Sequence, residues 1–146
     1  MCIRDRNADP TVGADVHFLN TGVPHAVAFL DKLEGLDISR LGAYLRYHEA
    51  FSPKGTNANF ARILSPGHIA IRTYERGVED ETLACGTGIT ACALLHAVLT
   101  DAPSPIQVDV AGGDTLKVGF QRTGDRFTDV TLTGPADLVF TGDIQI

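Results

Sequence analysis

The chain consists mainly of short apolar runs of strand length, separated by polar breaks that contain glycine or proline. Residues 26–30 (Ala-Val-Ala-Phe-Leu) are apolar at every position, which is typical of a strand that is buried on both faces. Residues 106–110, 115–120 and 129–133 alternate apolar with polar side chains instead, as strands with one buried face do. Glycine-containing turns join these last three runs and predict two hairpins.

Two segments predict helices. In residues 37–47 the apolar side chains recur at helical spacing, and Asp37 precedes them as a suitable N-cap. The inward-facing positions of this helix would be Ile38, Leu41 and Leu45. Residues 89–99 form a strongly apolar helical run that ends before two prolines. Further strands are predicted at residues 15–19, 57–64, 69–74 and 136–144. The sum is an α+β fold, in which a mostly antiparallel, barrel-like sheet wraps around one central apolar helix.

The length of 146 residues suits a single domain with a sizeable core. We predict that residues 12–135 form this domain. Residues 1–11 are polar and show no apolar period, so they are interpreted as an unplaced leader or a truncated start. Residues 136–146 are assigned to the last strand.

Composition excludes several classes of partner. With 44% hydrophobic and 21% charged residues, the chain has the balance of a globular protein. A net charge of −6 without a basic cluster argues against nucleic acid and acidic membrane surfaces as partners. No apolar run approaches the roughly 20 residues that a membrane-spanning helix needs. The N-terminus resembles no secretory signal, so the cytoplasm is the predicted location.

The three cysteines predict neither a disulfide nor a metal site. Cys2, Cys85 and Cys92 form no C-x-x-C pair, and they show no zinc-like spacing with the five histidines. Cys85 and Cys92 would lie roughly 10 Å apart along a helix, which is too far for a disulfide. Cys92 is therefore predicted to be a small core residue.

Cys85 has the more informative position, because Gly86, Thr87 and Gly88 follow it and open the predicted apolar helix. The first backbone N–H groups of a helix lack intrahelical partners, and together with the helix dipole they favour a thiolate or a bound carboxylate. A lone cysteine in an apolar segment is more often an inert core residue. The combination of strand, charged loop, Cys-Gly-Thr-Gly turn and small-residue helix nevertheless favours a functional thiol.

Three motifs occur in order along the chain: Thr-Gly-Val-Pro-His at residues 21–25, Gly-Thr-Asn-Ala-Asn-Phe at residues 55–60, and a third at residues 75–88. The third begins with Glu-Arg-Gly and ends with Glu-Thr-Leu-Ala-Cys-Gly-Thr-Gly. Together they resemble the C-terminal half of the diaminopimelate epimerases, from about residue 12 onward. Cys-Gly-Thr-Gly alone is shared with the proline racemases, whereas Glu-Arg-Gly and Asn-x-Asn-Phe favour the diaminopimelate enzymes.

The resemblance implies an isomerase that interconverts LL- and meso-2,6-diaminopimelate in lysine and peptidoglycan precursor synthesis, without pyridoxal phosphate or another cofactor. Two cysteines, one from each of two similar domains, would act as thiolate base and thiol acid. By resemblance Cys85 is one of this pair. The N–H groups of Gly86 and Thr87 would hold the α-carboxylate and stabilise the charge that develops on it.

Further site residues follow from the resemblance. Asn57 would hydrogen-bond the distal amino-acid end of the substrate, and Arg76 would bind its carboxylate. Glu75 would take the distal ammonium or orient the site, and His25 would lie near the thiol and tune its protonation. Without the resemblance, a strand-edge asparagine, a solvated ion pair and a turn histidine would be the plainer interpretations.

One position departs from the family's pattern. Many members carry asparagine directly before Pro-His as a substrate ligand, and this chain has Val23 there. Asn20 lies three residues earlier, so its role stays open.

The family's first domain, with its Cys-Gly-Asn-Gly turn, has no counterpart in this sequence, and Cys2 does not match that turn. We therefore expect the chain to need an N-terminal domain for activity, and residues 136–146 to pack on that domain. The full-length enzyme would be able to form a homodimer. Alone, the chain is expected not to epimerise at a useful rate.

Three alternatives remain open at the level of sequence. One is a proline or hydroxyproline racemase-like enzyme, and the second is a non-catalytic half domain that binds an amino acid. The third, a thiol peroxidase, is weaker because Cys92 is poorly placed to resolve an oxidised Cys85.

Overall fold

The computed structural model describes residues 2–3 and 14–145. The domain boundary predicted at residue 12 and most of the predicted leader lie outside these residues. Within the leader, Cys2 and Ile3 form a short strand, β1 (Cys2–Ile3), that pairs with the next strand along the chain.

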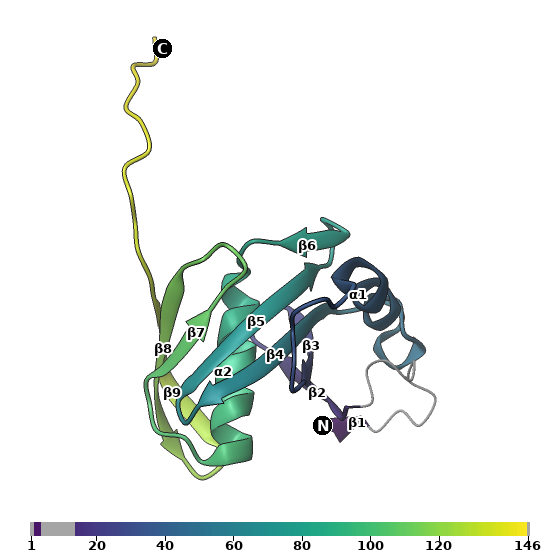
Figure 1. Ribbon diagram of the computed structural model, residues 1–146. Coiled ribbons are helices and arrows are strands. Elements are labelled where there is room, and N and C mark those ends of the chain that lie inside the picture. The colour runs from purple at the N-terminus through teal and green to yellow at the C-terminus, as the bar shows by residue number, and fades with distance from the viewer. Residues whose placement is uncertain (1, 4–13, 146) are drawn as a thin grey trace.

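The described residues form one sheet of nine strands and two α-helices (Figure 1). The strands are β1, β2 (Val16–Asn20), β3 (Pro24–Phe29), β4 (Asn57–Ser65), β5 (His68–Glu75), β6 (Asp80–Thr82), β7 (Ile106–Asp109), β8 (Thr115–Thr123) and β9 (Arg126–Thr133). The helices are α1 (Ile38–Arg46) and α2 (Gly86–Thr100), and a 3-10 turn, η1 (Glu49–Phe51), follows α1.

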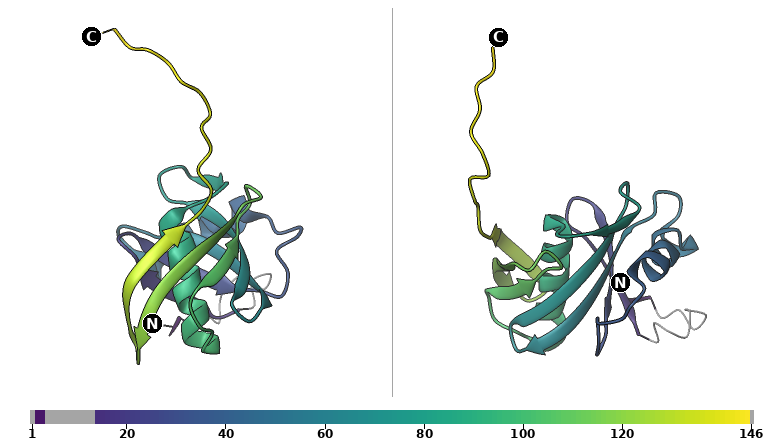
Figure 2. Two further views of the ribbon diagram at one scale, coloured as in Figure 1. Left: turned by 90° about the vertical axis from the view of Figure 1, so that its left-hand side faces the viewer. Right: turned by 45° about the horizontal axis from the view of Figure 1, so that its top comes forward.

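The strand order is β1-β2-β3-β4-β5-β7-β8-β9, and β6 pairs with β5 beside this path. Only the β3–β4 and β5–β7 pairs are parallel. The sheet curls around α2, while α1 packs on the other side of the central strands (Figures 1 and 2). The α+β fold with a mostly antiparallel sheet around a central helix, predicted from the sequence, is therefore confirmed.

The strands β3, β4 and β5 have a core on each face. Val27, Ala61 and Ile71 point into the core that contains α2. Their neighbours Ala28 and Phe60 point into the second core, beneath α1. Because both faces are covered, β3 needs apolar side chains at successive positions, as the sequence predicted.

Two segments differ from the sequence prediction. The sequence predicted a charged loop between the preceding strand and the Cys-Gly-Thr-Gly turn, but residues 80–82 of this segment form β6 on the edge of β5, after a turn in which Gly77 and Glu79 have positive φ angles. Residues 136–144 were predicted as a strand, and this is wrong within the chain: they form no strand and lead away from the domain (Figures 1 and 2). Their apolar side chains find no partner surface, and four of them are 81–87% exposed: Leu138, Val139, Phe140 and Ile144.

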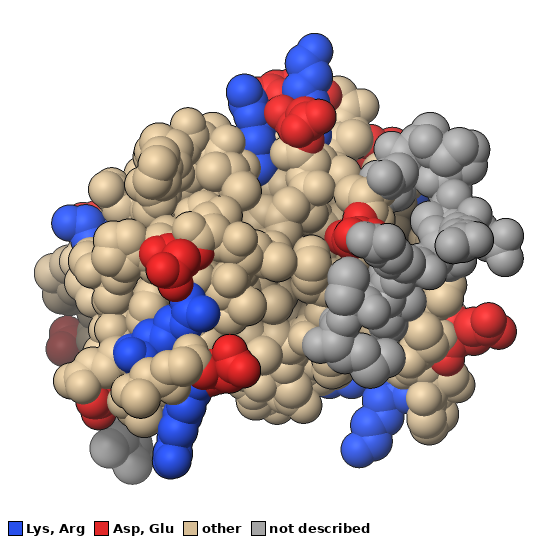
Figure 3. All heavy atoms as spheres, turned by 90° about the horizontal axis from the view of Figure 1, so that it is seen from below, with Lys and Arg blue, Asp and Glu red and all other residues tan. Residues whose placement is uncertain are grey.

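The surface carries dispersed charge. Figure 3 shows one face on which Lys and Arg side chains occur singly or in small groups, with acidic side chains beside several of them. None of the described helices is long and apolar enough to cross a membrane.

The close contact between α1 and β5 generates a first prediction. A Cβ at Gly42 would overlap the Cβ and ring of Tyr74. Alanine is the better helix former by about 1 kcal/mol, so Gly42→Ala would stabilise the chain if packing did not matter. We expect the overlap to dominate and the free energy of unfolding in urea to fall by about 1–3 kcal/mol.

Gly142→Ala is the matched control, because a Cβ there meets no atom within 4 Å. We expect it to leave the unfolding curve unchanged. A Gly42→Ala chain as stable as the wild type would contradict the packing described for α1.

Candidate active site

Cys85 is the N-cap of α2, the helix at the centre of the sheet. Its backbone is extended, with φ −131° and ψ 106°, and its carbonyl accepts the first helical hydrogen bond from the N–H of Ile89 at 2.8 Å. The helix begins at Gly86, so Gly86, Thr87 and Gly88 form its first turn. The first N–H groups of α2 are therefore beside the sulfur, without intrahelical partners.

The thiol of Cys85 is connected to His25 through a hydroxyl group. Thr87 Oγ1 lies 3.6 Å from Cys85 Sγ and 2.9 Å from His25 Nε2. The backbone carbonyl of Thr87 in turn accepts a hydrogen bond of 2.9 Å from the hydroxyl of Thr21. His25 thus comes near the thiol, as expected, with Thr87 between them.

Asn59 holds the other side of the imidazole. Its Nδ2 lies 3.1 Å from His25 Nδ1 and 3.1 Å from the carbonyl oxygen of Ala26. Its Oδ1 accepts a hydrogen bond of 3.0 Å from the hydroxyl of Thr73. Neither Asn59 nor Thr73 was predicted from the sequence to belong to the site. The alternation in Asn-x-Asn was the available signal, because it places Asn57 and Asn59 on the same face of β4.

Burial sets the protonation of His25. Its side chain is fully buried, and this burial, with a smaller contribution from the positive charge of Arg76, lowers the pKa of His25 to about 4. The imidazole is therefore neutral at pH 7. Cys92 is likewise fully buried, and burial raises the pKa of its thiol, so it is the inert core residue that the sequence predicted.

Asn57 ties two backbone segments together. Its Nδ2 donates to the carbonyl oxygen of Pro24 at 3.0 Å, and its Oδ1 accepts from the backbone N–H of Arg76 at 2.8 Å. Glu75 is half-buried at the end of β5, directly before Arg76. Asn57 thus fixes the place where the strand ends and the Glu-Arg-Gly turn begins.

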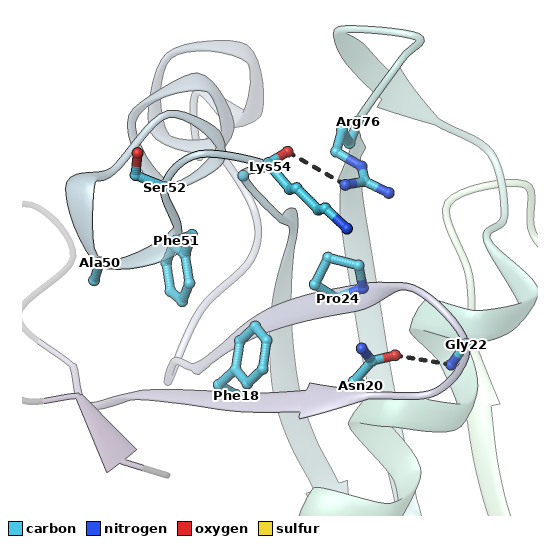
Figure 4. A pocket seen from close by; sticks show the side chains of 10 residues that line it. Phe18, Asn20, Gly22, Pro24, Ala50, Phe51, Ser52, Lys54 and Arg76 are labelled. Carbon is cyan, nitrogen blue, oxygen red and sulfur yellow. Dashed lines mark hydrogen bonds between the residues drawn. The ribbon is translucent and has the colours of Figure 1, made fainter.

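The side chain of Arg76 borders a pocket of about 500 Å³ and donates a hydrogen bond of 3.2 Å to the carbonyl oxygen of Lys54 (Figure 4). Asn20 also lines this pocket, but its Oδ1 accepts from the N–H of Gly22 at 3.0 Å within the β2–β3 turn. Cys85 is not among the lining residues, so within this chain the pocket and the thiol are separate. The lining residues are Phe18, Asn20, Gly22, Pro24, Ala50, Phe51, Ser52, Lys54, Gly55 and Arg76.

No group of three or more His, Cys, Asp or Glu side chains in residues 2–3 and 14–145 is placed to hold a metal ion. The chemistry that the described residues offer is that of a thiol beside helix N–H groups, with a neutral imidazole and hydroxyls behind it.

The family model and the curated relatives agree on one family. The model of a family described as diaminopimelate epimerase matches residues 17–139. A diaminopimelate epimerase of Chlorobaculum tepidum is 45% identical over 131 residues, which are 89% of this chain and 50% of that protein. One of Flavobacterium psychrophilum is 47% identical over 124 residues, 84% of this chain and 48% of that protein.

The chain thus spans about half the length of the curated relatives it matches. Among solved structures, the Bacillus anthracis phenazine biosynthesis protein of the PhzF family superposes with a TM-score of 0.52 at 16% identity. The match covers 77% of this chain and 37% of that one, and it supports the fold alone.

Thiol reactivity tests the contrast between Cys85 and Cys92. We expect iodoacetamide at neutral pH to modify Cys92 at least about tenfold more slowly than Cys85 in the folded chain, because Cys92 is fully buried. Peptide mapping by mass spectrometry gives the two rates separately. In denaturant the rates should converge, and equal rates in the folded chain would contradict the burial of Cys92.

The buried imidazole predicts a pH dependence of stability. The pKa of His25 is about 4 in the folded chain and has an ordinary value of 6.5. Between these values the unfolded chain binds more protons, so stability is fully present above pH 6.5 and is lost as the pH falls toward 4. We expect the wild type to lose roughly 2 kcal/mol more than His25→Gln between about pH 7 and pH 5, measured by urea unfolding.

His17 and His96 also have pKa values lowered by burial. The difference between the wild type and His25→Gln removes their contribution. Parallel pH curves for the two proteins would show that His25 does not titrate as described.

Proposed function

The chain belongs to the diaminopimelate epimerase family, and we propose that it is the C-terminal half of such an epimerase, with Cys85 as one of its two reacting thiols. The single observation that carries the proposal is the position of Cys85 as the N-cap of α2, directly before the first helical N–H groups, which lack intrahelical partners. The substrate would be LL- or meso-2,6-diaminopimelate, in lysine and peptidoglycan precursor synthesis, in the cytoplasm.

In the proposed reaction one thiolate removes the proton from the α-carbon and becomes a thiol. The opposite thiol gives its proton to the other face of the same carbon and becomes a thiolate. The negative charge that develops between these steps spreads onto the α-carboxylate, which the N–H groups of Gly86 and Thr87 would stabilise. No pyridoxal phosphate is required, because preorganised N–H dipoles take the place of an electron-withdrawing cofactor.

Residues at the end of β5 would recognise the distal half of the substrate. Arg76 carries the guanidinium suited to a carboxylate, and Glu75 beside it would take the ammonium. The role proposed for Asn57 is to offer its amide to the distal end while holding the backbone of Arg76. His25 would act next to the thiol as a neutral group.

A complete site requires a second thiol on the opposite face of the substrate. We propose that another domain supplies it, in keeping with the half-length match to the curated relatives. Residues 136–146 would pack on that domain, which would cover the exposed side chains of Leu138, Val139 and Phe140. The assembled enzyme would be able to form a homodimer.

A chimera tests the proposal. Replacing the matching half of the Chlorobaculum tepidum epimerase with this chain should give an enzyme that incorporates solvent deuterium at the α-carbon of LL-diaminopimelate with inversion. Cys85→Ala should lower this rate by about 10²–10⁴-fold, because it removes a group that transfers the proton. Cys92→Ala, in the core, is the control and should retain activity. The assay is mass spectrometry and chiral separation of the product.

Three outcomes would contradict parts of the proposal. A Cys85→Ala chimera with full activity would exclude the role of the thiol. A chimera that binds diaminopimelate without exchanging it would favour the non-catalytic binding domain. Rapid deuteration with inversion by the isolated chain would show that no second domain is needed.

A further inference from the structure

A continuous row of polar side chains crosses three strands and ends at Cys85. Its hydrogen bonds join Thr73 to Asn59 at 3.0 Å and Asn59 to His25 at 3.1 Å. They continue from His25 to Thr87 at 2.9 Å, and the hydroxyl of Thr87 lies 3.6 Å from the sulfur of Cys85. Thr73, Asn59 and His25 are buried, so these groups depend on one another for their hydrogen bonds.

The sheet register produces this row. Asn59 is opposite Thr73 across the β4–β5 pair and opposite Val27 across the β3–β4 pair. His25 lies two residues before Val27 on the same face of β3, which is the face that packs on α2.

Gly88 brings the helix close to this row. A Cβ at Gly88 would lie 2.5 Å from Asn59 Oδ1, 3.3 Å from His25 Cε1 and 3.4 Å from Cys85 Sγ. The helix start, the imidazole and the amide therefore meet at one point, which a larger residue would fill.

The carbonyl of Ala26 fixes the orientation of the Asn59 amide. A carbonyl oxygen only accepts hydrogen bonds, so the group 3.1 Å from it must be the Nδ2 of Asn59. The Oδ1 then faces Thr73, whose hydroxyl donates to it. The second hydrogen of Nδ2 points at His25 Nδ1, which must present a lone pair. A neutral His25 consequently carries its proton on Nε2.

The tautomer decides the direction of the remaining bonds. His25 Nε2–H donates to Thr87 Oγ1, so the hydroxyl hydrogen of Thr87 is free to point at the sulfur. We propose that Asn59 and Thr87 are positioning residues, in which Asn59 locks His25 in the Nε2–H tautomer and Thr87 donates a hydrogen bond to Cys85. On this arrangement His25 does not accept the proton of the thiol. Any contribution of the Thr87–Cys85 hydrogen bond to catalysis rests on the proposed function.

The Nδ1–H tautomer of His25 would lose a hydrogen bond in the same geometry. If His25 Nε2 instead accepted a hydrogen bond from the Thr87 hydroxyl, the proton of the neutral imidazole would be on Nδ1 and would point at the Nδ2 donors of Asn59 at 3.1 Å. Two donors would then face each other in a buried site, and one would lose its hydrogen bond.

The tautomer can be observed directly in the isolated chain. Long-range ¹H–¹⁵N correlation spectra of ¹⁵N-histidine-labelled chain at pH 7 should show His25 with its proton on Nε2, assigned by comparison with His25→Gln. Asn59→Asp should move the proton to Nδ1, since a carboxylate accepts the hydrogen bond that the amide donates. Asn59→Leu has a similar shape but no polar group, so it should give a mixture of the two tautomers. It replaces Asn59→Asp as the test if the buried carboxylate prevents folding.

Alkylation rates test the hydrogen bond that Thr87 is proposed to donate to the sulfur of Cys85. Thr87→Val should slow the reaction of Cys85 with iodoacetamide at pH 7.5 by about three- to tenfold, the range that one lost hydrogen bond supports. Thr87→Ser should restore the wild-type rate. Thr90→Val is the matched control in the same helix, because its hydroxyl bonds only to the carbonyl of Gly86 in this site, at 2.9 Å.

A wild-type His25 with its proton on Nδ1, or a Thr87→Ser chain that reacts as slowly as Thr87→Val, would overturn this inference. These results do not depend on turnover. An inactive chimera with the expected spectra and alkylation rates would contradict the proposed function alone. An active chimera with the opposite tautomer would contradict the inference alone.

Discussion

The packing of α2 inside the curl of the sheet is the constraint on which the rest of the structure depends. The helix contacts β2, β3, β4, β5, β7 and β8, and its side chains fill the core between them. Only small residues allow its first turn to approach β3 and β4, which is why Gly88 meets Asn59 and His25 directly. Burial of this helix places its N-terminus, and with it Cys85, at the end of the strands that carry the polar row.

An apolar environment makes the few polar groups in this core mutually dependent. His25, Asn59 and Thr73 are buried beside Val27 and Ile71. A buried polar group without a partner costs about 1–3 kcal/mol, so each of them is held by its neighbour in a single arrangement. The same burial that keeps the imidazole neutral thus also orients it. The contacts of His25, Asn59 and Thr73 therefore contribute both to the stability of the core and to the chemistry at the start of α2.

Two features of the chain bear on the proposed second domain. The thiol lies outside the pocket that Arg76 borders, and the apolar residues at 138–140 are exposed. Both features agree with a family whose curated relatives are about twice as long as this chain. If the proposed domain covered both the tail and the thiol, the exclusion of water would strengthen the electrostatic interactions around the thiol.

The sequence by itself determined most of the helices and strands, and it placed the thiol at the start of a helix. Strand and helix periodicities are local, and the Cys-Gly-Thr-Gly turn predicted Cys85 at a helix start without knowledge of the fold. The apolar pattern of residues 136–144 also predicted a strand there, and this was wrong within the chain. Such a pattern does not reveal whether the edge of another strand is present to pair with it. The polar row was decided by the tertiary structure alone. Thr87 and His25 are 62 residues apart, and His25 and Asn59 are 34 apart, so only strand order and register bring them together. A local pattern specifies which face a side chain takes, but the pairing of strands specifies what it meets there.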